Sequence, residues 1–307
     1  MIKRETMRHR ALVTGATGYI GSKLVKRLIS IGWTVHIVIR PNSKLTCLMP
    51  FLEQITVHKH DGTTHGMVAL VAKANPDTVF HLASLFLAEH KLGDVENLIV
   101  SNVLFATQLT QAMVNNNVTN FVNSGTSWQY FCGNDYDPVN LYAATKQAFE
   151  SLLKFYVETN DLKVITLALF DTYGPDDSRK KLIPLFFDVK KTDQELIMSP
   201  GRQLIDLVYI DDVIDAFVIA AKLLRKQVIK HSLYGISSKS AMPLVDVVKT
   251  FEAVTSITLP IKWGGRSYRA REIMIPWSQH SALPGWEPKT SLREGLTKIK
   301  NALDENH

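Results

Sequence analysis

The sequence predicts an α/β protein with a doubly wound parallel sheet and a smaller lobe toward the C-terminus. Short apolar runs that are typical of buried strands alternate with helical patterns through the first 170 residues. The first of these runs ends in a loop with three evenly spaced glycines, and this loop leads directly into a helix. Alternating strands and helices of this kind predict a parallel sheet with helices on both faces.

Length and composition fit a soluble globular protein with a large core. The 307 residues, 46% apolar and 21% charged, can form two domains or one large domain with a lobe. The net charge of +6 comes without a run of five or six like charges, so we expect no nucleic-acid binding. No run of 18 apolar residues predicts a transmembrane helix, and the basic start lacks the apolar core of a signal peptide. We expect a cytoplasmic protein, with Cys47 and Cys132 as buried, inert thiols.

The glycine loop, Gly15-Ala16-Thr17-Gly18-Tyr19-Ile20-Gly21, has the form of a dinucleotide-binding turn. It joins the apolar run 11–13 to a helix, whose unpaired N–H groups favour an anion. Its three glycines permit, in order, a tight turn, close approach of a pyrophosphate, and close packing of the helix on the strand. The alternative is a βα turn without a ligand. The residues expected to bind the cofactor here are Gly15, Thr17, Gly18, Tyr19, Ile20 and Gly21.

A basic turn follows the second predicted strand, Thr34–Ile39. Arg40 lies 19 residues beyond Gly21, where a dinucleotide-binding fold meets the adenosine ribose. An acidic residue there would favour NAD, whereas an Arg accommodates the 2′-phosphate of NADP. Arg40, followed closely by Ser43 and Lys44, therefore indicates NADP as the cofactor. NAD remains an alternative. The alternative is a solvated basic turn.

The strongest chemical signal is a Tyr and a Lys four residues apart at the start of a predicted helix. Tyr142 and Lys146 share one helix face, and the strand 120–123 leads into Thr126 at the end that faces the ligand crevice. A phenol is a poor acid or base at neutral pH, because its pKa is near ~10. A lysine cation beside it would lower that pKa and could also hold the nicotinamide ribose. We therefore predict Thr126, Tyr142 and Lys146 as catalytic; the alternative is an accidental Tyr/Lys pair.

Together these motifs resemble the extended short-chain dehydrogenase/reductase family, in its nucleotide-sugar epimerase, dehydratase and reductase branch. Further matches are His81-Leu82-Ala83 at the fourth strand and Tyr173-Gly174-Pro175 after the sixth. The resemblance implies a Rossmann dinucleotide-binding domain over residues 1–170 and a mainly nucleotide-sugar-binding lobe over 171–307, interleaved with it. It also implies cofactor contacts from a second group of residues, namely Asp61, Gly62, Leu82, Ala83, Ser84 and Asn102.

The residues after Thr126 distinguish members of this branch. Nucleotide-sugar 4,6-dehydratases have Asp-Glu there for water elimination, whereas this chain has Ser127-Trp128, so dehydration is not expected. The segments around Thr126 and Tyr142 look most like the CDP-abequose synthase group of 4-ketosugar-nucleotide reductases. The family's usual Val-Tyr-Gly is replaced by residues 128–131, which changes the expected sugar pocket. By resemblance, the substrate contacts are Ser127, Arg202 and Arg269.

The resemblance implies NADPH-dependent reduction of the 4-keto group of a nucleotide-linked deoxyhexulose, with CDP as the nucleotide, for lipopolysaccharide O-antigen synthesis. Two alternatives stay open: an NAD-dependent 4-epimerase that uses the same catalytic residues, and a non-catalytic NAD(P)-sensing protein. A homodimer through helices near 97–116 and 141–160 is expected by analogy. No metal site is expected, and Asp211 and Asp212 are predicted to cap a helix.

Overall fold

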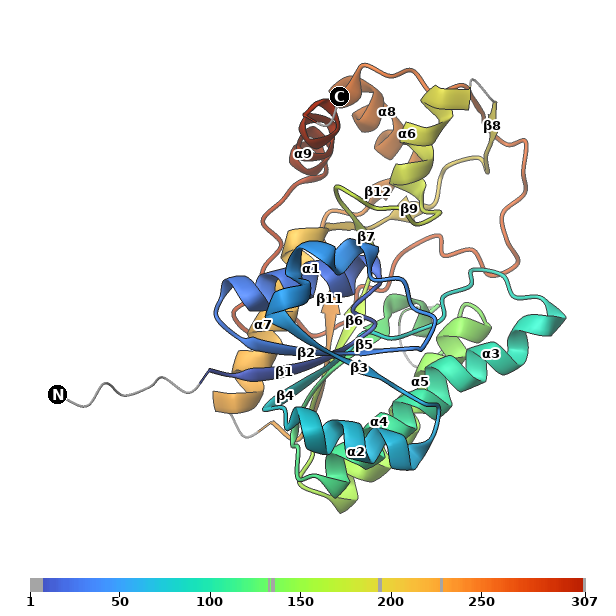
Figure 1. Cartoon of the computed structure of the whole chain (residues 1–307). Coiled ribbons are helices and arrows are strands. Elements are labelled where there is room, and N and C mark those ends of the chain that lie inside the picture. The colour runs from blue at the N-terminus through green and yellow to red at the C-terminus, as the bar shows by residue number, and fades with distance from the viewer. Residues whose placement is uncertain (1–7, 132, 134–135, 193–194, 227–228, 306–307) are drawn as a thin grey trace.

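The computed structural model describes residues 8–305 except 132, 134–135, 193–194 and 227–228. Its centre is a seven-stranded parallel sheet in the order β11-β6-β5-β4-β1-β2-β3 (Figure 1). Strand order reverses between β1 and β4, and ligands of such sheets bind there, outside the carboxyl ends. The strands of this sheet are β1 (Arg10–Thr14), β2 (Thr34–Ile39), β3 (Ile55–Lys59), β4 (Thr78–His81), β5 (Asn120–Thr126), β6 (Lys163–Leu169) and β11 (His231–Ile236).

Helices cover both faces of the sheet (Figure 1). α1 (Tyr19–Ser30) and α7 (Ile210–Lys226) pack on one face, and α2 (Thr64–Ala74), α4 (Phe105–Asn115) and α5 (Leu141–Thr159) pack on the other. Strands enclosed in this way are buried on both sides, which is why they are near-continuous apolar runs in the sequence. The predicted doubly wound α/β fold is confirmed.

The helix predicted near 97–116 contains a short π-helical segment. It consists of α3 (Val95–Ile99), the π-helical residues Val100–Leu104, and α4, which follow one another without a break. π-helical turns are widened turns that often lie at functional sites. This one carries Asn102, whose side chain is buried.

The C-terminal part of the chain forms a smaller lobe, drawn above the sheet in Figure 1. It contains α6 (Leu182–Thr192), α8 (Leu244–Thr255) and α9 (Leu292–Asp304). α7 and β11 return to the sheet, so the chain after residue 170 contributes to both parts. The short strands are β7 (Asp171–Tyr173), β8 (Leu196–Ile197), β9 (Leu204–Ile205), β10 (Leu207–Tyr209), β12 (Met242–Pro243) and β13 (Ile261–Lys262), and the 3-10 segments are Thr46–Gln54, Leu92–Asp94 and Ser127–Gln129.

Polar side chains fix where α5 begins and how the chain end is anchored. Asn140 caps α5 by accepting the backbone N–H of Ala143 at 2.9 Å. Asp211 and Asp212 lie in the first turn of α7, as predicted, but Asp212 is buried and its carboxylate accepts the backbone N–H of Thr290 at 3.0 Å. Asp212 therefore anchors the C-terminal segment on α7, which a cap alone would not do.

Cys47 is exposed, so the expectation that it is buried is wrong. It lies in the 3-10 segment Thr46–Gln54, which turns Leu48 into the core and leaves the thiol 3.5 Å from the carbonyl oxygen of Thr17. A short apolar stretch buries only the side chains that its turn directs inward. Cys132 lies outside the described residues.

Candidate active site

The glycine loop joins β1 to α1 with a geometry that suits a dinucleotide. Gly15 has a φ of 68°, and a Cβ there would lie 2.6 Å from the backbone nitrogen of Ala83. A Cβ on Gly21 would overlap the carbonyl oxygen of Gly15. Gly18 is the N-cap of α1, and in the described part of the chain no side chain caps this helix. The first-turn N–H groups are therefore available to an anion such as a pyrophosphate.

The residues predicted to meet the adenosine lie in two exposed turns after β2 and β3. In the turn Arg40–Lys44, the Ser43 hydroxyl accepts the backbone N–H of Arg40 at 3.2 Å and leaves the guanidinium exposed. In the turn Asp61-Gly62, the Asp61 carboxylate accepts the N–H and the hydroxyl of Thr63 at 2.8 and 2.9 Å. These hydrogen bonds lower the pKa of Asp61, so the carboxylate is ionised at neutral pH.

Asn102 holds the segment after β4 in place. Its side-chain oxygen accepts the hydroxyl of Ser84 at 3.1 Å and the N–H of Leu85 at 2.7 Å. Its amide donates to the Leu85 carbonyl at 3.0 Å and to the Thr145 hydroxyl at 2.9 Å. These bonds occupy the side chain, so Asn102 positions Ser84 against α5 rather than presenting a free group to a ligand.

His81 is a packed strand histidine. One ring nitrogen lies 2.8 Å from the Thr14 hydroxyl, which also accepts the N–H of Ala83 at 3.2 Å. Burial, with the Lys146 cation nearby, lowers the pKa of His81 well below its ordinary value, so the ring is neutral. This network fixes the backbone of Leu82 and Ala83 against the glycine loop.

Tyr142 lies on the buried face of α5, against the carboxyl end of β5, and is 8% exposed. Burial raises the pKa of Tyr142 to about 12, and the hydroxyls of Ser84 and Thr126, which face the phenol, lower it in part. The phenol is therefore protonated at neutral pH, and the expectation that Lys146 lowers its pKa is wrong for this structure, in which the ammonium is bonded to Ser124. In this form it can donate a proton to an oxygen bound beside it.

Lys146 is bonded to β5. Its ammonium donates to the carbonyl oxygen of Ser124 at 2.7 Å and lies 3.5 Å from the hydroxyl of the same residue. Burial lowers the pKa of Lys146 to about 8, and the carboxylate of Glu150, one turn further along α5, raises it in part. The amine is therefore mostly charged at pH 7 and titrates just above it.

A cavity of about 750 Å³ lies between the strand ends and the C-terminal lobe. Thr126, Tyr142 and Lys146 are not in its lining; Tyr142 lies behind Phe86, which is part of the lining. The wall nearest α5 is aromatic: Phe86 packs edge-to-face on the Tyr142 ring at a centroid distance of 5.0 Å and lies 5.5 Å from Trp128. Ser127 lines the same wall and is buried. The volume is in the range of small-molecule binding sites.

Cationic side chains line the cavity on the side of the lobe. Arg269, a predicted substrate residue, is among them, and its guanidinium lies 3.3 Å from the Glu89 carboxylate. Arg202 is exposed outside the lining, and its backbone N–H donates to the Tyr268 hydroxyl at 3.1 Å. The cations of the lining that sequence reasoning did not single out are Arg179, Lys180, Lys181, Arg266 and Arg271. The basic run 179–181, which three residues separate from the Tyr-Gly-Pro turn, was a signal for three of them.

Lys181 brings a positive charge to the aromatic wall. Its ammonium lies over the Phe86 ring, 4.0 Å from the centroid, and 5.6 Å from the Trp128 ring. The Asp171 carboxylate, 3.2 Å away, offsets this charge. A polar group bound at this wall would therefore lie near both the Lys181 ammonium and the Asp171 carboxylate.

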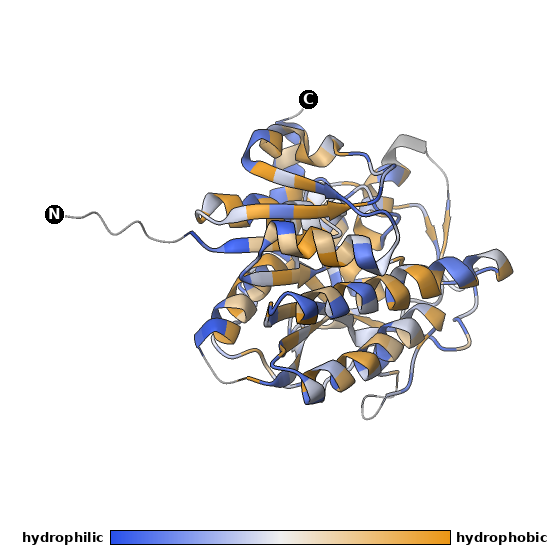
Figure 2. Ribbon diagram, turned by 60° about the horizontal axis from the view of Figure 1, so that its bottom comes forward, coloured by the Kyte–Doolittle hydropathy of each residue, from blue (hydrophilic) through white to orange (hydrophobic). Residues whose placement is uncertain are grey.

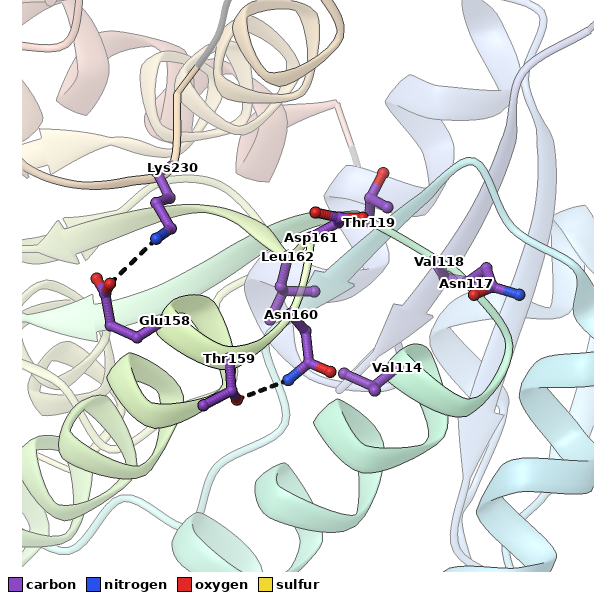
Figure 3. A pocket seen from close by; sticks show the side chains of 10 residues that line it. All are labelled: Val114, Asn117, Val118, Thr119, Glu158, Thr159, Asn160, Asp161, Leu162 and Lys230. Atoms are coloured by element: carbon purple, nitrogen blue, oxygen red, sulfur yellow. Dashed lines mark hydrogen bonds and ion pairs between the residues drawn. The ribbon is translucent and has the colours of Figure 1, made fainter.

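Another hollow, of about 560 Å³, lies at the opposite ends of the strands (Figure 3). Thr119 and Leu162, which precede β5 and β6, line it together with the ion pair between Glu158 and Lys230, 3.0 Å apart. None of the predicted site residues lines this hollow. Because parallel sheets bind ligands at the carboxyl ends of their strands, we assign the candidate site to the cavity beside Tyr142.

Within the described residues, no cluster of three or more His, Cys, Asp or Glu side chains is arranged to hold a metal ion. In the same part of the chain, none of the helices combines the length and apolar character needed to cross a membrane.

The dinucleotide loop and the buried Tyr-x-x-x-Lys pair beside a cavity define an NAD(P)-dependent oxidoreductase of the extended short-chain dehydrogenase/reductase type. The model of the NAD dependent epimerase/dehydratase family matches residues 11–233, which is most of the chain. The chain belongs to this family.

The curated relatives that match the chain include enzymes named for nucleotide sugars. A CDP-abequose synthase of Yersinia pseudotuberculosis is 27% identical over 293 residues, which are 95% of this chain and 99% of the relative. A CDP-abequose synthase of Salmonella muenchen is 25% identical over 294 residues, covering 94% and 96%. A UDP-glucose 4-epimerase of Mycolicibacterium smegmatis is 29% identical over 230 residues, covering 69% and 72%.

Solved structures share the fold over nearly the whole chain. The UDP-glucose 4-epimerase of Thermotoga maritima, solved with UDP-glucose, has a TM-score of 0.84 at 22% identity, covering 96% of this chain and 99% of that one. MoeE5, solved with UDP-glucose and NAD, has a TM-score of 0.79 at 26% identity, covering 97% and 100%.

Proposed function

We propose that this chain is an NADPH-dependent reductase of the 4-keto group of a nucleotide-linked deoxyhexulose, with CDP as the favoured nucleotide. The observation that carries the proposal is the protonated phenol of Tyr142, which the Thr126 hydroxyl faces and which packs against Phe86 in the cavity wall. Ketone reduction needs a proton donor, and a phenol whose pKa is raised to about 12 is one at neutral pH. The CDP-abequose synthases that match nearly the whole chain support the substrate class.

The site residues then have separate tasks. A bound nicotinamide would supply hydride to the keto carbon. Tyr142 donates its proton to the keto oxygen, and the Thr126 hydroxyl holds this oxygen by a hydrogen bond. Lys146 holds the ribose of the dinucleotide and stabilises the phenolate that remains. Ser127-Trp128, directly after Thr126, supplies no carboxyl group for removing water, which supports reduction over dehydration.

The lining of the cavity supports a deoxysugar, which has few hydroxyl groups, as the sugar of the proposed substrate. Phe86 and Trp128 would face the sugar near Tyr142, where a hydroxyl without a partner is costly to bury. Arg269 at the far side is suited to bind a pyrophosphate, because its planar guanidinium makes bidentate contacts. In this proposal residues 1–170 form the dinucleotide-binding domain, and residues 171–307 supply most of the substrate lobe.

Arg40 supports NADPH as the cofactor. Its guanidinium is exposed after β2, where it can bind a 2′-phosphate. The Arg40→Asp variant removes this group and presents a carboxylate that suits a free ribose hydroxyl. We expect wild type to bind NADPH more tightly than NADH in a fluorescence titration, and Arg40→Asp to reverse that order. If Arg40→Asp still binds NADPH more tightly than NADH, Arg40 does not bind the 2′-phosphate.

The decisive test of the proposal is cofactor exchange combined with turnover. The purified chain is denatured to release any retained dinucleotide, and the native protein is then assayed with NADPH and a CDP-4-keto-deoxyhexulose. Reversible NADPH binding and one NADPH oxidised per sugar reduced would support the reductase. Stoichiometric, tightly retained NAD would favour the 4-epimerase. Dinucleotide binding without oxidation of NADPH or reduction of the sugar would favour a sensing protein.

We further propose a homodimer in the cytoplasm, engaged in O-antigen synthesis. Five large apolar side chains on the two expected interface helices are exposed: Ile99, Val100, Leu104, Leu152 and Phe155. Figure 2 colours the ribbon by the hydropathy of each residue. Exposed apolar side chains on the helices of an expected interface support association of two copies. Light scattering should give twice the mass of 34.5 kDa, and Phe155→Lys should reduce it to the monomer.

A further inference from the structure

A buried carboxylate lies beside the candidate catalytic lysine and has no task in the function proposed above. Glu150 follows Lys146 by four residues on α5, so the two side chains lie on one helix face, and that of Glu150 is 12% exposed. Both are bonded to neighbouring residues of β5: Lys146 donates to Ser124, and Asn123 donates its amide to Glu150 at 2.6 Å. The carboxylate therefore lies one helical turn from the ammonium, on the same face of α5, where little water screens the attraction between the two charges.

Groups from three strands hold the Glu150 carboxylate. In addition to Asn123 of β5, the Thr166 hydroxyl of β6 donates to the same oxygen at 2.7 Å. A ring nitrogen of His231 on β11 lies 3.4 Å from the other oxygen. Because this carboxylate is so little exposed and both of its oxygens have partners, its position is fixed. The position of its negative charge is therefore fixed as well.

We propose that Glu150 is a positioning residue: held by this network, it places a negative charge behind Lys146 and keeps the lysine charged while it binds the dinucleotide ribose. The inference rests on the role that the proposed function gives to Lys146. It extends that role by naming the partner that makes a buried ammonium tolerable.

The other titratable groups around this pair cannot supply the same charge. His81 faces Lys146 from β4, and burial keeps it neutral. His231 can carry only a positive charge. Tyr130 faces Glu150, and burial together with this carboxylate raises its pKa to about 12, so it is neutral as well. Since the pKa of Lys146 is lowered to about 8 even with Glu150 present, removing the carboxylate should leave the amine largely neutral at pH 8.

The test measures the charge of Lys146 directly. The full-length protein is labelled with ε-¹³C-lysine, the Lys146 signal is assigned by its loss in Lys146→Met, and its titration is followed together with NADPH affinity. Glu150→Gln keeps an acceptor for Asn123 and Thr166 and removes only the charge. Glu150→Ala is a second neutral variant in case the first does not fold. The matched control is Glu158→Gln on the same helix, which removes an exposed carboxylate paired with Lys230 (Figure 3).

We expect Lys146 to titrate at least one pH unit lower in Glu150→Gln than in wild type or the control. NADPH affinity at pH 8 should fall roughly five- to tenfold, because one unit changes the ratio of charged to neutral amine about tenfold. A Lys146 titration that stays at the wild-type value in the neutral variants would overturn the inference. NADPH affinity that Lys146→Met leaves unchanged at every pH would instead overturn the ribose-binding role of Lys146, while the titration still reports on Glu150.

Discussion

The guanidinium of Arg179 lies over the ring of Tyr19, 4.4 Å from its centroid, and so connects the cavity to the glycine loop. Arg179 also donates to the Asp177 carboxylate at 2.7 and 2.8 Å and to the Thr172 carbonyl at 2.8 Å. The phenol of Tyr19 donates to the Pro175 carbonyl at 3.2 Å. The turn that forms one wall of the candidate substrate site is therefore held directly against the candidate cofactor loop.

Replacing Arg179 should destabilise the protein. In Arg179→Gln the Asp177 carboxylate, 2% exposed, loses its charged partner, and we expect a loss of about 1–3 kcal/mol in the free energy of unfolding. Lys23→Gln is the control, because it breaks the more exposed ion pair with Asp176 and should cost less than about 1 kcal/mol. Urea denaturation measures both. Equal losses would mean that the buried pair adds nothing beyond a surface contact.

Tyr142→Phe removes the proposed proton donor and leaves the ring packed against Phe86. We expect turnover to fall by about 10²- to 10⁴-fold, the usual contribution of a general acid, with NADPH affinity within about twofold of wild type. The control is Tyr156→Phe on the same helix, whose phenol instead donates to Gln111 at 3.0 Å. Stopped-flow NADPH oxidation gives the rates. Full turnover in Tyr142→Phe would exclude Tyr142 as the acid.

Asn102→Ala should cost more stability than the loss of any one of its hydrogen bonds. It leaves the part-buried backbone groups of Leu85 and the hydroxyls of Ser84 and Thr145 without this partner, and we expect a loss of about 2–4 kcal/mol. Thr145→Val removes one bond to Asn102 together with the bond that Thr145 donates to the Tyr142 carbonyl, and should cost about 1–2 kcal/mol. Thermal unfolding compares the two variants, and similar melting temperatures would contradict the shared-anchor role.

The lowered pKa of Lys146 should make the free energy of unfolding depend on pH. Burial lowers its pKa from 10.5 to about 8, so between these values the unfolded chain binds more protons than the folded one. The stability of wild type relative to Lys146→Met should therefore be lowest below pH 8 and rise toward pH 10.5, by at most about 3 kcal/mol. Urea denaturation at several pH values measures this difference. A flat difference would show that folding leaves the pKa unchanged.

Elements governed by local pattern were predictable from the sequence. The second strand has the predicted bounds, Thr34–Ile39, because strands enclosed by helices are largely apolar runs. The shared helix face of Tyr142 and Lys146 also followed from spacing alone. Both side chains are buried on α5, at the strand ends where the prediction placed them.

Features that depend on contacts between residues far apart in the sequence could not be predicted from local pattern. β11 reads His-Ser-Leu-Tyr-Gly-Ile, which is too polar to predict a strand by itself, and becomes an edge strand because all six of its residues pair with β6. The pairing of Arg269 with Glu89 and the network around Glu150 likewise join residues far apart in the chain. Cys47 was misjudged because a short 3-10 segment shows no clear amphipathic period.

The position of β11 at the edge of the sheet sets a constraint on biosynthesis. When the ribosome has made 170 residues, β6 is complete but lacks its outer neighbour, and α7 is absent from one face. At ~5–20 residues per second, the 66 residues from 171 to 236 take roughly 3–13 s to translate. During this time the nascent chain carries an open strand edge, which is a template for aggregation. Expression of a fragment ending at residue 170 should therefore yield insoluble protein, although that fragment contains Thr126, Tyr142 and Lys146.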